Sequence, residues 1–195
     1  MRLLYMAGIA YLLATAFALT RGLPWVSHPI VTPVTTASTA TNGGGGGGGG
    51  AWFEQARSRC NTLEVEIVHR HDPPPTSLEG VGYSAACWAL AGRIDDARRQ
   101  ILTLSVDNRW KAAGIVFNVG HPVADMGDDL SAGPIMELVV EFWPNHYMAL
   151  YHAGAARYAL GDFEPAGRHL QAFLQTYDQK DGWTSSAKAM LKEIG

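Results

Sequence analysis

Apolar residues follow helical spacing between Ser84 and Ala166, and small residues recur among them in a fixed order. Three sets of small residues share offsets of seven and then five residues, and the sets are separated by 35 and then 34 residues. The sets are Ala85, Gly92 and Ala97; Gly120, Gly127 and Ala132; and Gly154, Gly161 and Ala166. An internal repeat of this period is typical of a stacked helical array. A small residue lets two crossing helices approach, and a Gly between them supplies the positive-φ turn, so each set predicts one helical hairpin.

Apolar spacing also predicts a helix at each end of this array. The first spans Trp52 to Ile67 and is stopped by the Asp72 to Pro75 segment. It is expected to cover the first hairpin, which comprises Leu78 to Ala91 and Ile94 to Leu104. The last helix spans Trp183 to Ile194 and is expected to cap the final hairpin, because terminal repeats need shielding from water.

The second hairpin departs from this pattern. Its first helix is predicted over about Ala112 to Val119, because Pro122 would remove a hydrogen bond and kink or end the helix. Its second helix is predicted to begin only at about Pro134 and to end at Trp143. The segment from His121 to Asp129 is therefore predicted to be a loop. Departures from a repeat are common where function has been added.

The N-terminal residues have the composition of a targeting segment and a linker. Arg2 is followed by eighteen uncharged residues, Leu3 to Thr20, and a helix of that length spans about 27 Å, enough for a bilayer core. Residues 1–21 are therefore expected to be a signal peptide or a membrane anchor; Ala16 and Ala18 favour cleavage, whereas the length of the run favours retention. A buried helix is the alternative. Residues 22–50, rich in Thr and Pro and ending in eight glycines, predict a flexible linker before a domain at 51–195.

The third hairpin, Tyr147 to about Lys180, has the fullest motif: Leu150, Gly154, Tyr158, Gly161, Asp162, Phe163, Ala166 and Leu170. The second ends on Pro144 and Asn145, and the first lacks such a proline. On these residues the chain resembles the tetratricopeptide repeat (TPR) family over roughly residues 78–180. The resemblance implies an all-α, right-handed stack of about three helical hairpins with N- and C-terminal capping helices.

In that family the first helices of the hairpins line a concave groove that takes an extended peptide or a helix of a partner. The register places these residues on the groove: Glu79, Ala86, Phe117, His121, Asp125, Met148, Tyr151, Ala155 and Tyr158. The resemblance therefore implies a membrane-tethered or secreted protein-interaction scaffold, with its folded domain on the non-cytoplasmic side. A structural membrane-associated subunit without a groove ligand is a further alternative. Fifteen basic and eighteen acidic residues, a net charge of −3, give no reason to expect nucleic acid.

The predicted loop also holds residue types found in metal and acid/base sites. The candidate residues within it are His121, Asp125, Asp128 and Asp129, and Glu137, Glu141, His146 and His152 follow. A simpler interpretation is that Asp128 and Asp129 cap the next helix. The sequence has no HExxH motif, and its Asp spacing does not fit a calcium loop. No catalytic residue, metal or cofactor is therefore assigned. A small metal-dependent or acid/base enzyme using His121, Asp125 and Asp128 remains the alternative function.

The two cysteines, Cys60 and Cys87, stand on either side of the proline-rich turn at similar distances from it. Antiparallel pairing of the flanking helices would bring them to comparable heights. A disulfide, which export would allow, and two buried thiols both fit this spacing. The spacing does not fit a zinc site.

Overall fold

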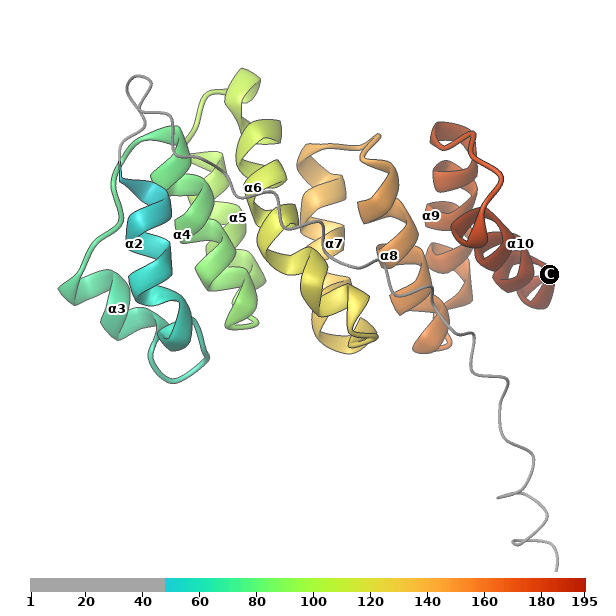
Figure 1. Cartoon of the computed structure of the whole chain (residues 1–195), viewed down its shortest axis with the longest axis horizontal. Helices are drawn as coiled ribbons and strands as arrows, with labels where there is room; N and C mark the ends of the chain where they lie inside the picture. The colour runs from blue at the N-terminus through green and yellow to red at the C-terminus, as the bar shows by residue number, and fades with distance from the viewer. Residues whose placement is uncertain (1–47) are drawn as a thin grey trace, which may run out of the picture. The chain divides into compact units, whose positions relative to one another are not determined.

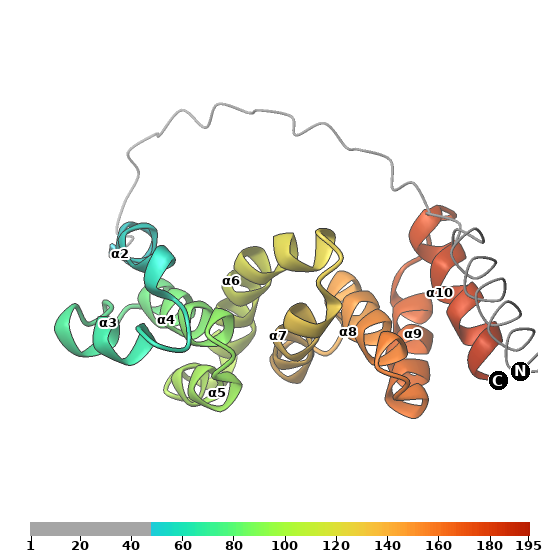
Figure 2. The ribbon, with the colours of Figure 1, turned by 90° about the horizontal axis from the view of Figure 1, so that it is seen from below.

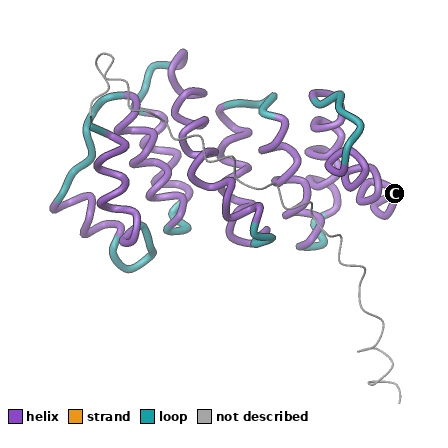
Figure 3. The backbone as a smooth tube through the Cα atoms, in the orientation of Figure 1, coloured by secondary structure: helices purple, strands orange, loops and turns teal. Residues whose placement is uncertain are grey.

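The computed structural model describes residues 48–195, so the predicted signal or anchor segment and all but the last three linker residues lie outside it. The described residues form helices joined by loops and contain no strand (Figures 1 and 3), which confirms the all-α prediction for this part of the chain. The helices are α2 (Gly49–Ala56), the short 3₁₀ helix η1 (Arg57–Arg59), α3 (Val65–His71), α4 (Leu78–Leu90), α5 (Ile94–Leu102), α6 (Val106–Asp125), α7 (Asp129–Phe142), α8 (Tyr147–Ala159), α9 (Phe163–Thr176) and α10 (Gly182–Ile194).

Each helix packs mainly on helices one or two places away in the chain. Helix α4 packs against α5 and α6, α6 against α7, α7 against α8, and α8 against α9. Figures 1 and 2 show the helices following one another from α2 at one end to α10 at the other. One apolar cluster joins α2 through α7 to the start of α8, and a second joins α8, α9 and α10. Val140 packs against both clusters and so connects them.

Three glycine turns join the paired helices. Gly92, Gly127 and Gly161 have φ values of +73°, +81° and +75°. At each turn the glycine N–H and the next N–H donate back to the last turn of the preceding helix, the pattern of a Schellman cap. The prediction that these glycines end the first helix of each hairpin is therefore confirmed.

Small residues lie where these helices cross. A Cβ added at Gly120 would lie 2.7 Å from Cγ2 of Ile135 in α7, and one at Gly154 would lie 2.7 Å from Cγ of Leu170 in α9. The predicted alanines Ala85, Ala97, Ala132 and Ala166 are all buried. Close approach of the helix backbones thus depends on these positions, as their repeated spacing predicted.

The predicted loop in the second hairpin is wrong. Helix α6 begins at Val106 and continues through Pro122 to Asp125, and α7 begins at Asp129 and continues through Pro134. Each proline removes only one helical hydrogen bond, and because the prolines are on exposed surface, water can satisfy the carbonyl left without a donor. Figure 1 shows α6 continuing from its lime turns into its yellow turns.

The single helix predicted from Trp52 to Ile67 is also wrong, because a turn separates α2 from α3. The side chain of Asn61 accepts hydrogen bonds from the backbone N–H of Leu63 and of Glu64 at 3.0 and 3.1 Å, an arrangement that favours a turn over a continuing helix. Leu63 is 86% exposed and Ile67 53% exposed instead of lying in the core.

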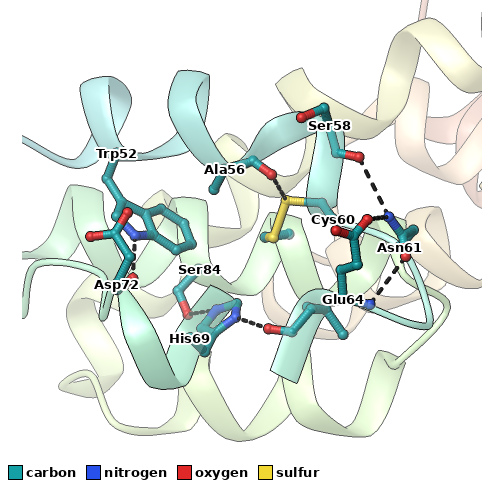
Figure 4. The surroundings of a disulfide bond; sticks show 11 residues. Trp52, Ala56, Ser58, Cys60, Asn61, Glu64, His69, Asp72 and Ser84 are labelled. Atoms are coloured by element: carbon teal, nitrogen blue, oxygen red, sulfur yellow. Dashed lines mark hydrogen bonds between the residues drawn. A yellow bond between two sulfur atoms is a disulfide. The ribbon is translucent and has the colours of Figure 1, made fainter. Parts of the chain in front are cut away.

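A disulfide joins Cys60, just after η1, to Cys87 in α4, with the two Cα atoms 4.8 Å apart (Figure 4). This settles the choice between a disulfide and two free thiols. The Thr62 hydroxyl also donates to the carbonyl of Ala91 at 3.1 Å, which fixes the same turn against the end of α4.

The ring of His69 packs between Trp52 and Trp88, with centroid distances of 5.3 and 4.5 Å. Its Nε2 lies 3.0 Å from the Ser84 hydroxyl (Figure 4). Burial lowers the pKa of His69. This contact and the disulfide attach α2 and α3 to the first hairpin.

Glu137 links three helices. Its carboxylate in α7 accepts hydrogen bonds from Nε and Nη2 of Arg157 in α8 at 2.6 and 2.7 Å, and it lies 3.7 Å from Nε2 of His169 in α9. Burial raises the pKa of Glu137, but the contacts with His169 and Arg157 outweigh it and hold the pKa at about 2. The ionised carboxylate is therefore a stabilising connection between the second and third hairpins.

Glu137→Gln is expected to lower the free energy of unfolding at pH 7 by about 1–2 kcal/mol, less than the full pKa shift implies because the pair is partly exposed. The contribution of Glu137 is present above pH 4.5 and declines as pH falls toward 2, because the unfolded chain takes up the proton first. Urea denaturation at pH 7 and pH 3 measures both effects. The control is Glu141→Gln in the same helix, whose partner Arg98 is a surface contact; equal losses in the two variants would contradict the assignment.

Candidate binding surface on helices α6 and α8

Three of the predicted groove residues form a stripe on α6. Phe117, His121 and Asp125 are spaced four residues apart, so their side chains lie on one face of the helix. Phe117 is partly buried, whereas the side chains of His121 and Asp125 are 27% and 48% exposed. The rings of Phe117 and His121 stack with their centroids 4.6 Å apart. The α6 stripe thus presents an aromatic ring, an imidazole and a carboxylate in succession.

The predicted groove residues on α8 are divided between core and surface. Tyr151 is 7% exposed; its hydroxyl lies 3.0 Å from the Ser186 hydroxyl in α10, and its ring contacts Trp183. The hydroxyl of Tyr158 bonds to Glu193, also in α10. Met148 and Ala155 remain partly exposed. Helix α10 therefore covers part of the face that the register assigned to the groove.

The first hairpin contributes little to this surface. Glu79 lies in the first turn of α4, next to Gly50 of α2, and Ala86 is buried in the core. The structure thus brings the α6 stripe together with α8, and it leaves Glu79 at the α2 end of the array.

Rings from several helices gather beside the α6 stripe, and we call the set the aromatic–histidine cluster. Phe117 contacts His146, at the start of α8, with centroids 4.0 Å apart. His121 contacts His152 at 5.0 Å, and His152 contacts Trp183 at 5.6 Å. The cluster consists of Phe117, His121, His146, His152 and Trp183.

Within residues 48–195, one group of three His, Cys, Asp or Glu side chains is close enough to hold a metal ion: His121, Asp125 and His152. Oδ1 of Asp125 lies 3.4 Å from Nε2 of His121 and 3.9 Å from Nε2 of His152. Both Nε2 atoms are buried and have no hydrogen-bond partner. Burial and the nearby His121 lower the pKa of His152 to about 3, so this imidazole is neutral near pH 7.

Asp128 has a different role from the one that the alternative function gives it. Its carboxylate accepts a hydrogen bond from the backbone N–H of Ser131 at 3.2 Å and so caps α7. The residue that joins His121 and Asp125 is His152, from the next hairpin. The sequence held a signal for this, since His121 follows the marker Gly120 and His152 lies two residues before the marker Gly154. In the repeat register His152 corresponds to Asn118, so the two histidines lie about one helical turn out of register in successive repeats.

A separate pocket of about 500 Å³ lies at the glycine-turn ends of the first two hairpins. Its lining is largely apolar and includes Leu90, Ile94, Val123, Leu130 and Ile135. None of the predicted groove residues lines this pocket, and the repeat register gave no indication of it.

Comparison of the chain with protein-family models, characterised proteins and solved structures finds no match. Among the described residues, no helix has the length and apolar character needed to cross a membrane.

Proposed function

We propose that the protein is a TPR-like interaction scaffold whose α6 and α8 face binds an extended peptide or a helix of a partner protein. Three features support a stack of hairpins: each helix packs on helices one or two places away in the chain, three glycine turns share one geometry, and small residues lie at the crossings. Such arrays bind partners along the surface of their first helices.

The partly exposed rings and thioether beside the α6 stripe are the observation that carries this proposal. Phe117 is partly exposed on α6, and Tyr147 is 42% exposed at the start of α8, where Met148 follows it. Aromatic residues and Met are enriched at the centres of protein interfaces, where they supply much of the binding energy. An apolar face of a partner helix, with basic residues directed at Asp125, fits this chemistry.

The disulfide supports the proposed location. Disulfides persist in oxidising compartments and are rare in the cytosol, and Cys60 and Cys87 form one here. We therefore propose that the folded domain lies outside the cytoplasm, either secreted or held at the membrane by the N-terminal segment that lies outside the described residues.

The alternative function, a small metal-dependent or acid/base enzyme, would now rest on His121, Asp125 and His152, because Asp128 caps α7. A structural subunit without a ligand on this face is the third candidate. Peptide binding separates these two alternatives from the scaffold, because neither the enzyme nor the structural subunit requires the rings of Phe117 and Tyr147 to bind a peptide.

Selection of random displayed peptides on the immobilised full chain tests the proposal. We expect enriched peptides with an apolar face, and we expect Phe117→Ser and Tyr147→Ser each to weaken their binding about tenfold or more, the cost of removing an aromatic contact. Leu63→Ser is the matched control, because Leu63 is an exposed apolar residue on the turn between η1 and α3. Enrichment of no peptide, or equal binding by all three variants, would contradict the proposal.

A further inference from the structure

We propose that His121, Asp125 and His152 bind one divalent transition-metal ion, with zinc as the expected metal, and that the ion links α6 to α8. This site shares His121 and Asp125 with the proposed peptide surface. Zinc binding can nevertheless be tested separately, because neither Phe117 nor Tyr147 contributes a ligand to it. It also differs from the sequence-based alternative, which used Asp128.

The geometry is close to that of a metal-bound site. Ligand atoms at about 2.0–2.2 Å from a tetrahedral zinc ion lie roughly 3.3–3.6 Å apart. The three candidate ligand atoms all lie within 4.8 Å of one another, and the two histidine nitrogens lie 3.4 and 3.9 Å from the same Asp125 oxygen. Asp125 is about half exposed and His121 about a quarter exposed, so modest side-chain rotations can close the remaining distance.

The second observation that supports a metal site is a buried nitrogen of His152 that lacks a hydrogen-bond partner. Its side chain is 4% exposed, and its Nε2 has no hydrogen-bond partner although it faces the Asp125 carboxylate. Nε2 of His121 is also buried and also has no hydrogen-bond partner. A buried polar atom without a partner is costly, and two such atoms directed at one carboxylate are better explained by an ion between them than by chance packing.

The donor set selects the class of metal. Two imidazole nitrogens and one carboxylate suit zinc, cobalt, nickel or copper, whereas calcium and magnesium prefer oxygen ligands alone. Three protein ligands leave one coordination position for water. Phe117 and Trp183 contact the two imidazoles and shield them, while the exposed side of Asp125 leaves a path for the ion.

Metal titration of the untagged, EDTA-treated full chain tests the site. Calorimetry should show one zinc ion per chain with a micromolar or tighter Kd, and cobalt should give a visible absorption band of four-coordinate geometry. At a zinc concentration 100 times the Kd, the thermal midpoint should rise by about 5–10 °C. Calcium and magnesium should leave the midpoint unchanged.

Two ligand variants and two controls make the result specific. Asp125→Asn and His152→Gln should each weaken zinc binding at least tenfold; Asp125 is exposed, so its variant tests the site even if replacing the buried His152 perturbs folding. His71→Gln and Asp128→Asn should bind zinc like the wild type, because neither residue belongs to the site. Zinc binding only at millimolar concentration, an equal response to calcium, or full retention of binding in Asp125→Asn would overturn the proposal.

Discussion

Removal of the Cys60–Cys87 disulfide is expected to lower the free energy of unfolding by about 3–4 kcal/mol. The bond closes a loop with a sequence separation of 27 residues, and loop-closure entropy for that length gives this value. For a folded region of this size, the loss corresponds to a drop of roughly 10 °C in the thermal midpoint. Denaturation of the full chain and of the Cys60→Ser, Cys87→Ser double variant measures the difference.

The loss should be concentrated at the N-terminal end of the array. Helices α2 and α3 are short, and the disulfide and the turn around Thr62 hold them against α4. Hydrogen exchange in the double variant should therefore accelerate most in residues 49–71 and least in α8 and α9. A reducing agent should destabilise the wild type and have no effect on the double variant. Equal stability of the oxidised wild type and the double variant would show that the disulfide does not support the fold.

Gly133→Ala is expected to destabilise the protein by about 1–2 kcal/mol, although alanine is the better helix former. A Cβ at this position in α7 would lie 2.7 Å from Cβ of Ala156 in α8. Both atoms are attached directly to backbone, so the two helices must separate, at a cost of about 1–3 kcal/mol that exceeds the gain in helix propensity. Chemical denaturation of the variant gives the value.

Gly167→Ala is the matched control for this substitution. Gly167 is also inside a helix, α9, but a Cβ there would meet no atom within 4 Å. This variant should be neutral or more stable by up to about 1 kcal/mol, because alanine reduces the entropy of the unfolded chain. The two variants should therefore differ by about 1–3 kcal/mol. Equal effects would mean that α7 and α8 do not approach as closely as the structure indicates.

The glycine turns and crossing points were predictable from sequence because a positive φ or a close helix contact restricts a single position to a small residue. The second hairpin shows the limit of local rules, since Pro122 and Pro134 together argued for a loop between the two helices. The repeat register placed the end of α6 at Gly127, and the structure agrees with the register. One lost hydrogen bond on an exposed face costs less than the packing that holds the helix in place.

The turn between α2 and α3 and the candidate metal site were not predicted from the sequence. Both depend on contacts that the spacing of residues along the chain does not reveal. Apolar periodicity from Trp52 to Ile67 does not show that Asn61 forms a turn or that Cys60 bonds to Cys87. His152 joins His121 and Asp125 from a different hairpin, so it could be placed only by combining the repeat register with the packing of α6 and α8. Asp128, adjacent in sequence, caps α7, which confirms the simpler of the two roles predicted for it.

Packing of successive hairpins places His121 beside His152, and NMR of histidine-labelled protein in EDTA tests this arrangement most directly. The two ring centroids are 5.0 Å apart, so a nuclear Overhauser contact between their ring protons is expected. The contact between Phe117 and His121, one turn apart on α6, serves as the internal control. A clear Phe117–His121 contact with none between His121 and His152 would contradict the arrangement in which α7 packs on both α6 and α8 and brings these two rings together.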